Sequence, residues 1–338
     1  MKLDAPKPVR QGEEIDAKKL SAWLSQEVEA IEQFPRGHSN LTYLVRVAGK
    51  ELVLRRPPFG SKVKGAHDMV REARILEKLQ PVYPKAPKVI SICEDPSPIG
   101  APFYLMERIR GCVLRGADPQ GLDMRPLSER FVDALVELHS VDYERAGLAG
   151  KPEGYVRRQV EGWTKRWVDA RTDDVPDVDR AAAWLAERIP PERGAAFIHN
   201  DYKYDNLVLD GEARIAGVLD WEMSTVGDPL MDLGTALGYW IEEGDAEPLK
   251  AFSFGPTFAQ GSFTRKELVA AYARKSGRDV SGMLFYVVFA LFKTAVVLQQ
   301  IYKRYKEGLT KDERFAAMII GVQLLSAQAA HSIESGEF

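Results

Sequence analysis

Residues 198–221 read IHNDYKYDNLVLDGEARIAGVLDW, and this stretch decides how the rest of the chain is interpreted. A short apolar run leads into a polar loop that contains Asp201 and ends at Asn206. Two further apolar runs, separated by an Asp-Gly pair, then lead to Asp220. An Asp-Gly pair between apolar runs is typical of a β-hairpin. We therefore expect the two runs to pair as strands and to bring Asp220 beside Asn206.

The polar residues of this stretch predict a site for phosphoryl transfer. Mg²⁺ prefers oxygen ligands and usually takes one or two from the protein, so Asn206 and Asp220 are the expected metal ligands. Asp201 is then the candidate base that orients an acceptor hydroxyl and takes its proton. Lys203 follows two residues later and is expected to stabilise charge on the transferred group.

Four neighbouring residues have less specific expected roles. His199 is expected to support the loop by donating a ring N–H, with catalysis as the alternative. Asp205 is either part of the site or a solvated turn residue. Asp228 precedes a proline, as at the start of a helix, so a capping role is favoured over a catalytic one. Asp232 lies one turn further on and is expected to support the loop.

The N-terminal part predicts a small, mostly antiparallel sheet with one main helix. Alternating apolar patterns predict strands at residues 41–47, 51–55, 88–93 and 102–108, and helical spacing predicts helices at 15–30 and 67–79. A turn-rich stretch precedes the first strand, and its residues Gly37, Ser39 and Asn40 are candidates to contact phosphates. A plain hairpin is the alternative there.

Arg55 and Glu72 are candidates for a pair that holds nucleotide phosphates. A kinase fixes a strand-borne cation with a helix carboxylate so that the cation points at the phosphates. Arg56 is an alternative for the cation, and a solvated helix face is the alternative for Glu72. A connector is expected at residues 106–109, where the backbone groups of Met106, Glu107 and Ile109 are expected to bind the purine edge.

After residue 107 the pattern becomes mainly helical. Helices are expected at residues 127–139, 155–168, 181–189, 230–239, 264–275, 283–305 and 315–333. We predict an α+β fold in which residues 1–107 form a nucleotide-binding lobe and residues 108–338 a catalytic and acceptor-binding lobe. The apolar segment at 283–305 is interrupted by Lys293 and is expected to be a core helix. Disorder is expected at residues 1–12, and mobile loops at 171–179 and 242–260.

The pattern His199-x-Asp201-x4-Asn206, followed by LDWE at 219–222, resembles the aminoglycoside phosphotransferase and choline kinase-like family of small-molecule kinases. The run LDWEMSTVGDP at 219–229 is similar in particular to the kinase domain fused to acyl-CoA dehydrogenases and to its stand-alone bacterial relatives. The resemblance implies a bilobal protein-kinase-like fold, ATP and Mg²⁺ as cofactors, and the roles given above for Asp201, Asn206, Asp220, Arg55, Glu72 and residues 106–109. Two residues depart from the family pattern: Asn200 stands where Gly is more frequent, and Arg55 where Lys is common.

Charge and composition argue against several other classes. The 46 Lys and Arg against 49 Asp and Glu give a net charge of -3, which provides no overall attraction to nucleic acid or to acidic membranes. The two cysteines, Cys93 and Cys112, are too few for a disulfide framework. The polar start of the chain has no apolar leader. We expect a cytoplasmic protein.

The acceptor is expected to be a small molecule with a hydroxyl group. Arg157, Arg158 and Lys293 on predicted helices favour an anion, such as a hydroxy acid or a hydroxyacyl compound, and Glu222 is a further candidate contact. Solvated helix faces are the alternative for the basic residues. Trp163 and Trp167 either wall an apolar pocket or pack in the core. The alternative functions are an antibiotic kinase acting on an aminoglycoside or macrolide, and a non-catalytic nucleotide-binding protein.

Overall fold

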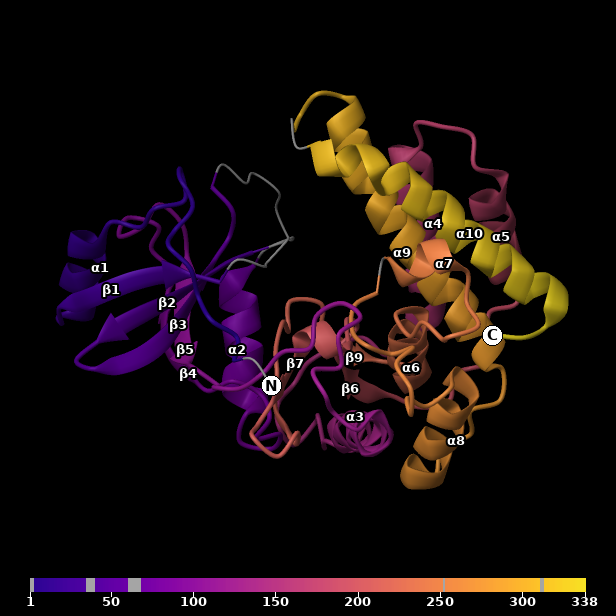
Figure 1. Ribbon diagram of the computed structural model, residues 1–338, viewed down its shortest axis with the longest axis horizontal. Helices are drawn as coiled ribbons and strands as arrows, with labels where there is room; N and C mark the ends of the chain where they lie inside the picture. The colour runs from indigo at the N-terminus through magenta and orange to yellow at the C-terminus, as the bar shows by residue number, and fades with distance from the viewer. Residues whose placement is uncertain (1–2, 35–39, 60–67, 252, 311–312) are drawn as a thin grey trace. The chain divides into compact units, whose positions relative to one another are not determined.

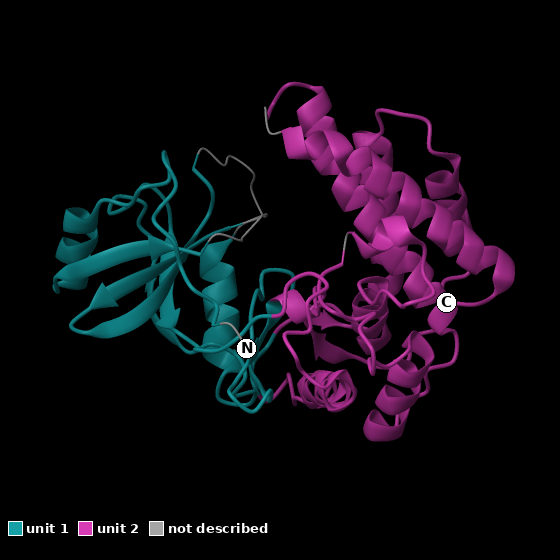
Figure 2. Ribbon diagram, in the orientation of Figure 1, with its two compact units in different colours: residues 1–113, 146–148, 206–223 teal, residues 114–145, 149–205, 224–338 magenta. Residues whose placement is uncertain are grey.

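The computed structural model describes residues 3–34, 40–59, 68–251, 253–310 and 313–338 (Figure 1). The chain forms two compact units, which Figure 2 distinguishes by colour. Unit 1 contains residues 1–113, 146–148 and 206–223, and unit 2 contains the rest. Residues 108–113 and the segment 206–223 therefore cluster with the N-terminal part. The assignment of residues 1–107 and 108–338 as functional lobes stays a prediction.

Unit 1 is built on a five-stranded antiparallel sheet with the strand order β1-β2-β3-β5-β4. The strands are β1 (Val28–Gln33), β2 (Leu41–Val47), β3 (Lys50–Arg56), β4 (Val89–Cys93) and β5 (Phe103–Glu107). Helix α2 (Met69–Leu79) contacts β4 and β5, and α1 (Ala17–Leu24) contacts β1. Helix α2 buries Met69, Ala73 and Leu76 on one face, as their helical spacing predicts.

The start of the chain differs from the sequence-based prediction in two ways. The helix expected at 15–30 ends at Leu24, because Ser25 adopts a left-handed conformation with φ 52°, and β1 follows. Strand β1 was missed because its residues fit a helical and an alternating pattern equally well. The predicted disorder is wrong for residues 3–12, where Lys7 exchanges two backbone hydrogen bonds of 2.8 Å with Gln33.

The predicted hairpin is confirmed. Strands β7 (Leu207–Leu209) and β8 (Ile215–Val218) pair antiparallel in unit 1. The side chain of Asp210 closes the turn by accepting from the N–H groups of Glu212 at 2.8 Å and Arg214 at 3.0 Å. Beyond the strands, the N–H of Leu219 donates to the carbonyl of Asn206 at 2.8 Å. The hairpin therefore brings Asn206 next to the residue that precedes Asp220.

Unit 2 is mainly helical, as predicted. Its helices are α3 (Met124–His139), α4 (Tyr155–Ala170), α5 (Pro176–Glu187), α6 (Pro229–Gly238), α7 (Glu247–Lys250), α8 (Arg265–Ser276), α9 (Met283–Lys306) and α10 (Met318–Ser335). Strands β6 (Ala196–Ile198) and β9 (Thr225–Gly227) pair antiparallel, and 3₁₀ turns occupy Tyr204–Asn206 and Glu313–Ala317. Part of α5 and all of α7 lie in segments that were predicted to be mobile loops. Trp163 and Trp167 are buried, which favours the core-packing alternative.

Helix α9 is the central helix of unit 2. It contacts α4, α5, α6 and α10, and it runs beside α10 in Figure 1. Two segments, Met283–Lys306 and Glu313–Ser335, are long and apolar enough to cross a membrane by length and composition alone. In the first, 67% of the most apolar window is buried inside the protein, as expected for a core helix.

Glycines let α6 approach α9 closely. A Cβ on Gly234 would lie 2.7 Å from the backbone oxygen of Tyr286, and one on Gly238 would lie 2.8 Å from the Cβ of Ala290. Both distances are shorter than van der Waals contact, so these positions of α6 have no room for a side chain. The close packing fixes α6, which carries Asp232 at one turn from its start.

Candidate active site

Arg55 links two carboxylates in unit 1. Its Nη1 donates to Oε1 of Glu72 at 2.7 Å, and its Nη2 donates to Oδ1 of Asp220 at 2.9 Å. Glu72 is fully buried, and its Oε1 also accepts from the N–H of Trp221 at 3.0 Å. Burial alone would lower the pKa of Arg55, but the charges of Glu72 and Asp220 outweigh it and raise that pKa. The solvated-face alternative for Glu72 is therefore wrong.

Arg56 has a different environment from Arg55. Its Nη1 donates to the carbonyl of Ile99 at 2.9 Å, and its Nε donates to the carbonyl of Pro57 at 3.0 Å. The guanidinium also lies over the ring of Phe59, 3.6 Å from the ring centroid. Of the two arginines, Arg55 is therefore the partner of Glu72, and Arg56 is held by backbone carbonyls.

The two candidate metal ligands stand on the hairpin. Asp220 has φ 69°, a left-handed conformation that Asp and Asn tolerate better than most residues and that is common at functional sites. Carboxylate and amide oxygens suit Mg²⁺, which takes its remaining ligands from water and phosphates. Among the described residues, no group of three or more His, Cys, Asp or Glu could hold a metal ion by itself. Asn206 and Asp220 offer one amide and one carboxylate oxygen, and this donor set fits Mg²⁺ bound together with a nucleotide.

The expected phosphate loop is described only at its end. Gly37 and Ser39 lie outside the described residues, whereas Asn40 is buried and donates through Nδ2 to Oε2 of Glu222 at 2.6 Å. The carbonyl of Glu222 accepts from Arg71 at 3.0 Å. Glu222 was predicted to contact the acceptor, but its hydrogen bonds here join parts of unit 1. Its role toward an acceptor stays a prediction.

Part of the backbone of residues 106–109, the connector expected to bind the purine, is hydrogen-bonded within the sheet. Met106 lies inside β5, opposite Val53 and Val89. The N–H of Glu107 donates to the carbonyl of Lys88 at 2.9 Å, so that group is already engaged. The side chain of Ile109 fills the space in front of Gly217. The assignment of Met106, Glu107 and Ile109 to purine binding stays a prediction.

Asp201 is the centre of a polar cluster in unit 2. The Nζ of Lys203 lies 2.7 Å from Oδ1 and 2.6 Å from Oδ2, and the hydroxyl of Tyr239 donates to Oδ1 at 2.9 Å. Burial would raise the pKa of Asp201, but the charge and hydrogen bonds of Lys203, with smaller contributions from His199 and Lys293, lower it overall. Asp201 is therefore a partly buried carboxylate that stays ionised.

Lys203 is itself held in place by aromatic rings. Its Nζ lies 4.7 Å from the ring centroid of Tyr239 and 5.2 Å from that of Phe254. A cation over a ring face is attracted by the negative face of the ring. Tyr239 and Phe254 were not found from the sequence, because they lie more than thirty residues from Asp201 along the chain and belong to no local motif.

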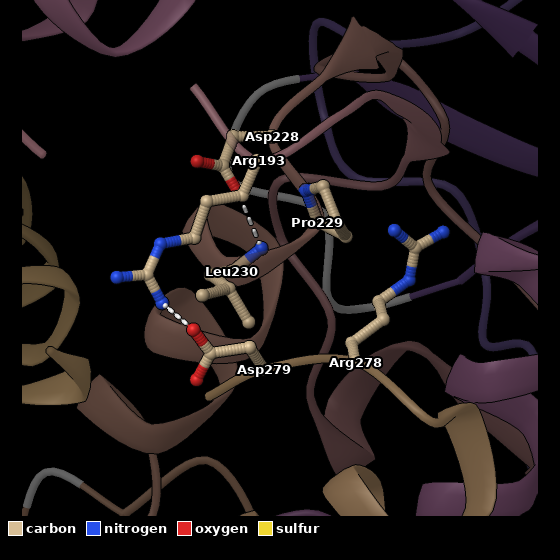
Figure 3. A pocket seen from close by; sticks show the side chains of 6 residues that line it. All are labelled: Arg193, Asp228, Pro229, Leu230, Arg278 and Asp279. Atoms are coloured by element: carbon tan, nitrogen blue, oxygen red, sulfur yellow. Dashed lines mark hydrogen bonds and ion pairs between the residues drawn. The ribbon is translucent and has the colours of Figure 1, made fainter. Parts of the chain in front are cut away.

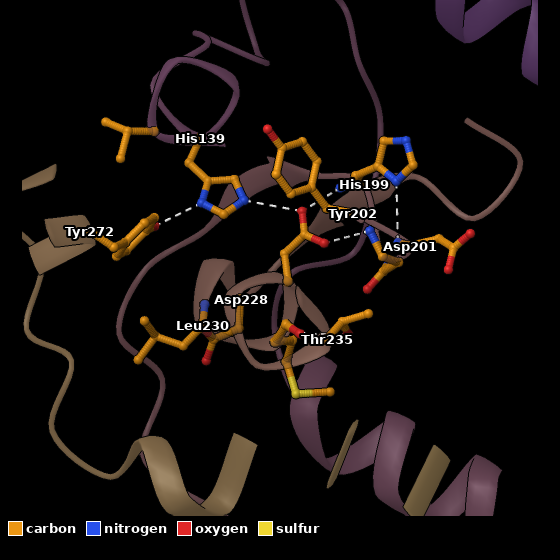
Figure 4. Close-up of polar contacts among 12 residues, drawn as sticks. His139, His199, Asp201, Tyr202, Asp228, Leu230, Thr235 and Tyr272 are labelled. Atoms are coloured by element: carbon orange, nitrogen blue, oxygen red, sulfur yellow. Dashed lines mark hydrogen bonds and ion pairs between the residues drawn. The ribbon is translucent and has the colours of Figure 1, made fainter. Parts of the chain in front are cut away.

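Asp232 supports the loop that holds Asp201 through hydrogen bonds to its backbone. It is fully buried and accepts from the N–H of His199 at 2.6 Å and of Asn200 at 2.7 Å. Its other contact is His139, whose Nε2 lies 3.1 Å from Oδ2 and whose Nδ1 lies 2.7 Å from the hydroxyl of Tyr272 (Figure 4). Burial would raise the pKa of Asp232, but these bonds and the nearby histidines lower it. The supporting role predicted for Asp232 is confirmed.

His199 contacts its own loop through the ring, and the ring N–H donation predicted for it stays a prediction. Its Nδ1 accepts from the N–H of Asp201 at 3.2 Å, so this ring nitrogen accepts and does not donate (Figure 4).

The capping role of Asp228 is confirmed by its bond from the N–H of Leu230 at 2.8 Å, and the hydroxyl of Tyr286 also donates to it at 2.9 Å.

A cavity of about 200 Å³ opens beside the start of α6 (Figure 3). It is lined by Arg193, Asp228, Pro229, Leu230, Arg278 and Asp279. Arg193 is paired with Asp279 at 2.8 Å, and Arg278 donates to the carbonyl of His139 at 3.2 Å. None of the lining residues belongs to the loop that holds Asp201.

The basic residues proposed for the acceptor have different positions. Arg157 is exposed, and Arg158 donates to the carbonyls of Lys151 and Glu153 at the start of α4. Lys293 is buried and donates to the carbonyl of Asn200 at 2.9 Å. Of the three, only Lys293 has a hydrogen bond here to the loop that holds Asp201. Acceptor binding by any of them stays a prediction.

Comparison with known sequences points to one family. The family model described as "Phosphotransferase enzyme family" matches residues 30–267. Acyl-CoA dehydrogenase family member 10 of Mus musculus is 35% identical over 284 residues, which are 82% of this chain and 26% of that protein. Acyl-CoA dehydrogenase family member 11 of Homo sapiens is 31% identical over 318 residues, 88% of this chain and 40% of that protein. The chain thus spans less than half the length of these relatives.

Solved structures show the same fold. A Ralstonia eutropha protein named after the aminoglycoside phosphotransferases superposes with a TM-score of 0.77 at 30% identity, covering 94% of this chain and 99% of that one. The aminoglycoside phosphotransferase APH(4)-Ia, in a ternary complex with ADP and hygromycin B, superposes with a TM-score of 0.63 at 16% identity, covering 94% and 98%. The predicted α+β fold, with an N-terminal antiparallel sheet and a larger helical part, is therefore confirmed.

Proposed function

Because the chain belongs to the phosphotransferase enzyme family, whose enzymes transfer a phosphoryl group to a hydroxyl, we propose that it is an ATP- and Mg²⁺-dependent kinase of a small hydroxyl-bearing molecule. The family resemblance expected from residues 199–206 and 219–229 is thereby confirmed. The nucleotide, the metal, the residue roles and the acceptor form the proposal.

The observation that carries the proposal is the environment of Asp201. Its carboxylate is partly buried and ionised, and Lys203 and Tyr239 fix its direction. Such a group orients an acceptor hydroxyl and takes its proton late in transfer, when the bond forming between the acceptor oxygen and the phosphorus has made that proton acidic. A strong base is not needed, so a lowered pKa suits this role.

Unit 1 supplies the groups expected for a nucleotide. Arg55 is directed by Glu72 and provides a fixed positive charge for phosphate oxygens, while Asn206 and Asp220 would hold the metal ion. When bound, Mg²⁺ neutralises negative charge that develops on the phosphates. Only four residues separate Asp201 from Asn206 along the chain. The ADP complex of APH(4)-Ia supports a nucleotide substrate for this fold.

The charges near Asp201 favour an anionic or neutral acceptor. Lys203 and Lys293 both lower the pKa of Asp201, so the base has positive neighbours. A polycation would be repelled by these lysines. A hydroxy acid or hydroxyacyl compound fits, and the names of the relatives, which refer to acyl-CoA dehydrogenases, agree with acyl chemistry. A cytoplasmic location is proposed with it.

An antibiotic kinase is the second candidate. It is favoured by the resemblance to viomycin phosphotransferase of Streptomyces vinaceus, which is 25% identical over 204 residues, 53% of this chain and 66% of that protein. A non-catalytic nucleotide-binding protein is the third candidate, and the ionised Asp201 argues against it because binding alone requires no base.

The test is phosphoryl transfer from radiolabelled MgATP to a panel of hydroxy acids, hydroxyacyl thioesters, aminoglycosides and macrolides. We expect transfer to an anionic member, and a loss of about 10²- to 10⁴-fold in kcat for Asp201→Asn. Asp169→Asn is the control, since it makes the same change at an exposed carboxylate. Transfer to aminoglycosides alone would support the antibiotic kinase, and MgATP binding without transfer would support the non-catalytic alternative.

A further inference from the structure

Asn200, the residue before Asp201, is held on three sides by three helices of unit 2. Its N–H donates to Asp232 on α6 at 2.7 Å, and its carbonyl accepts from Lys293 on α9 at 2.9 Å. Its side-chain amide meets the hydroxyl of Tyr155 on α4, which lies 3.0 Å from Nδ2 and 3.2 Å from Oδ1. Asp232 was expected to support the loop, but Tyr155 and Lys293 were not.

The conformation of Asn200 makes these contacts meaningful. Its φ is 65°, in the left-handed region where glycine is the least strained residue. A glycine there would keep both backbone bonds but would have no side chain to meet Tyr155. The asparagine therefore accepts some backbone strain and adds a third attachment, which ties the loop to α4.

Lys293 is an unusual residue for the core of a helical unit. Its ammonium is buried, and its Nζ lies 5.9 Å from the ring centroid of Trp163. Burial lowers the pKa of Lys293, whereas the charges of Asp201 and Asp232 oppose that effect and the charge of Lys203 adds to it. A buried ammonium costs free energy unless nearby carboxylates compensate for it. A neutral donor would satisfy the carbonyl of Asn200, so the charge itself needs an explanation.

We propose that Tyr155 and Lys293 are positioning residues that hold the loop of Asp201 through Asn200, and that Lys293 also supplies a fixed positive charge to the Asp201 carboxylate. The inference deepens the proposed function and rests on its assignment of Asp201 as the base. It gives Lys293 a role inside the protein, in place of direct contact with the acceptor.

The first experiment measures how firmly the loop is held. Hydrogen exchange is followed by mass spectrometry in peptides covering residues 196–206, without nucleotide or acceptor. We expect exchange about fivefold faster in Tyr155→Phe and Asn200→Gly, because each removes one attachment of the loop. Asn200→Gly is informative because it relieves backbone strain and yet is expected to loosen the loop. Unchanged exchange in both variants would show that Tyr155 does not hold the loop.

The second experiment measures the charge effect directly. The carboxyl carbon of Asp201 is titrated by NMR in protein labelled with ¹³C at aspartate, and its signal is assigned by its loss in Asp201→Asn. Among the described residues, the charged or titratable groups that face Asp201 include Lys203 and His199 from its own loop, Tyr239 from the end of α6, and Lys293 from α9. We expect the midpoint to move to higher pH in Lys293→Met and to stay near the wild-type value in Lys293→Arg.

Lys303→Met is the matched control for this titration. Lys303 lies on the same helix and also donates to a backbone carbonyl, that of Asp169 at 2.7 Å. We expect its removal to leave the Asp201 midpoint in place. If Lys293→Met does not fold, Lys293→Gln replaces it, since glutamine retains a donor but carries no charge.

The outcomes separate this inference from the proposed function. Equal midpoints in Lys293→Met, Lys303→Met and the wild type would overturn the role of the Lys293 charge. Both readouts need no acceptor and no turnover. If they follow expectation while no compound is phosphorylated, the positioning of Asp201 is supported and the proposed kinase function fails.

Discussion

Arg55 shows how a single residue organises the buried charges of unit 1. Its guanidinium donates to Glu72 and to Asp220 through two different nitrogens, a fork that the compact ammonium of a lysine does not reproduce. The departure from the family pattern at this position therefore joins the helix glutamate directly to a candidate metal ligand. Asp232 shows the complementary case, a buried carboxylate held mainly by backbone N–H groups and a histidine.

Replacing Arg55 alone should lower the free energy of unfolding more than replacing both Arg55 and Glu72. Arg55→Met leaves Glu72 buried without its cation, and we expect a loss of about 3–5 kcal/mol in the free energy of unfolding. The double variant Arg55→Met with Glu72→Met should recover most of that loss, because no buried charge remains unpaired at this point. Urea denaturation of the wild type, both single variants and the double variant measures the coupling. Strictly additive losses would contradict the interpretation.

The stabilisation contributed by Asp232 should depend on pH. Its pKa is lowered in the folded protein, so the unfolded chain takes up a proton first as the pH falls. The contribution is therefore complete above the ordinary Asp pKa of about 3.9 and is lost as the pH falls through the lower folded value. We expect the stability difference between wild type and Asp232→Asn to narrow below about pH 4, measured as urea midpoints from pH 6 to 2.5.

Asp169→Asn serves as the control for this pH series, because the Asp169 side chain is exposed and pairs with solvent-facing Lys165. A stability difference for Asp232→Asn that stays constant over the whole series would show that its carboxylate charge does not stabilise the fold.

At the scale of elements, the packing of α6 on α9 determines where Asp232 stands. The two glycines of α6 let its backbone approach Tyr286 and Ala290 on α9, and α9 also carries Lys293. The loop of Asp201 is thus attached to α6 and α9, and these two helices can pack this closely because glycines occupy the contact positions of α6. The hairpin β7–β8 has the corresponding role for Asn206 and Asp220 in unit 1.

Alanine in α6 should be destabilising although alanine favours helices. In a helix where the side chain has room, replacing Gly by Ala raises the free energy of unfolding by about 1 kcal/mol. At Gly234 the new Cβ meets backbone atoms of Tyr286, so we expect a net loss of about 1–3 kcal/mol from overpacking. Gly162→Ala in α4 is the matched control, since its Cβ meets only the movable end of Arg166 at 3.1 Å. Thermal unfolding of both variants measures the difference. A Gly234→Ala variant more stable than the wild type would show that α9 can shift to accommodate the new Cβ without a net loss of stability.

At the scale of the whole molecule, each unit is assembled from separate segments of the chain. Unit 1 needs residues 206–223 in addition to 1–113. Cys112 exchanges two backbone bonds of 2.8 Å with Leu209, and Lys85 accepts from the N–H of Val218 at 2.8 Å. The two units are therefore not two consecutive pieces of sequence.

A fragment of residues 1–113 should not keep Cys112 protected. Cys112 is buried in the whole chain, and the fragment lacks the hairpin strand that pairs with it. In a Cys93→Ser background, which leaves a single thiol, we expect the Cys112 thiol of the fragment to react with a disulfide reagent at least about tenfold faster than in the whole chain. The full-length Cys93→Ser protein is the reference, and equal rates would show that unit 1 forms without its hairpin.

Local chemistry accounts for what was predicted correctly from the sequence. The β7–β8 hairpin, the Asp228 cap and most helix positions follow from turn residues, capping residues and periodic apolar positions that lie within a few residues of one another. The pairing of Arg55 with Glu72 followed from a known requirement of kinase sites. Strand β1 was missed because its six residues did not distinguish a helix from a strand.

What the sequence determined by itself is the chemical identity of the side chains at the candidate site, a carboxylate at 201, an amide at 206 and a carboxylate at 220, and the family to which the chain belongs. The tertiary structure decided how these groups are held. Tyr239, His139, Tyr155 and Lys293 lie far from Asp201 along the chain, and only the packing of α3, α4, α6 and α9 brings them to its loop. Burial also depends on that packing, so the ionised state of Asp201 and the internal position of Lys293 are properties of the fold.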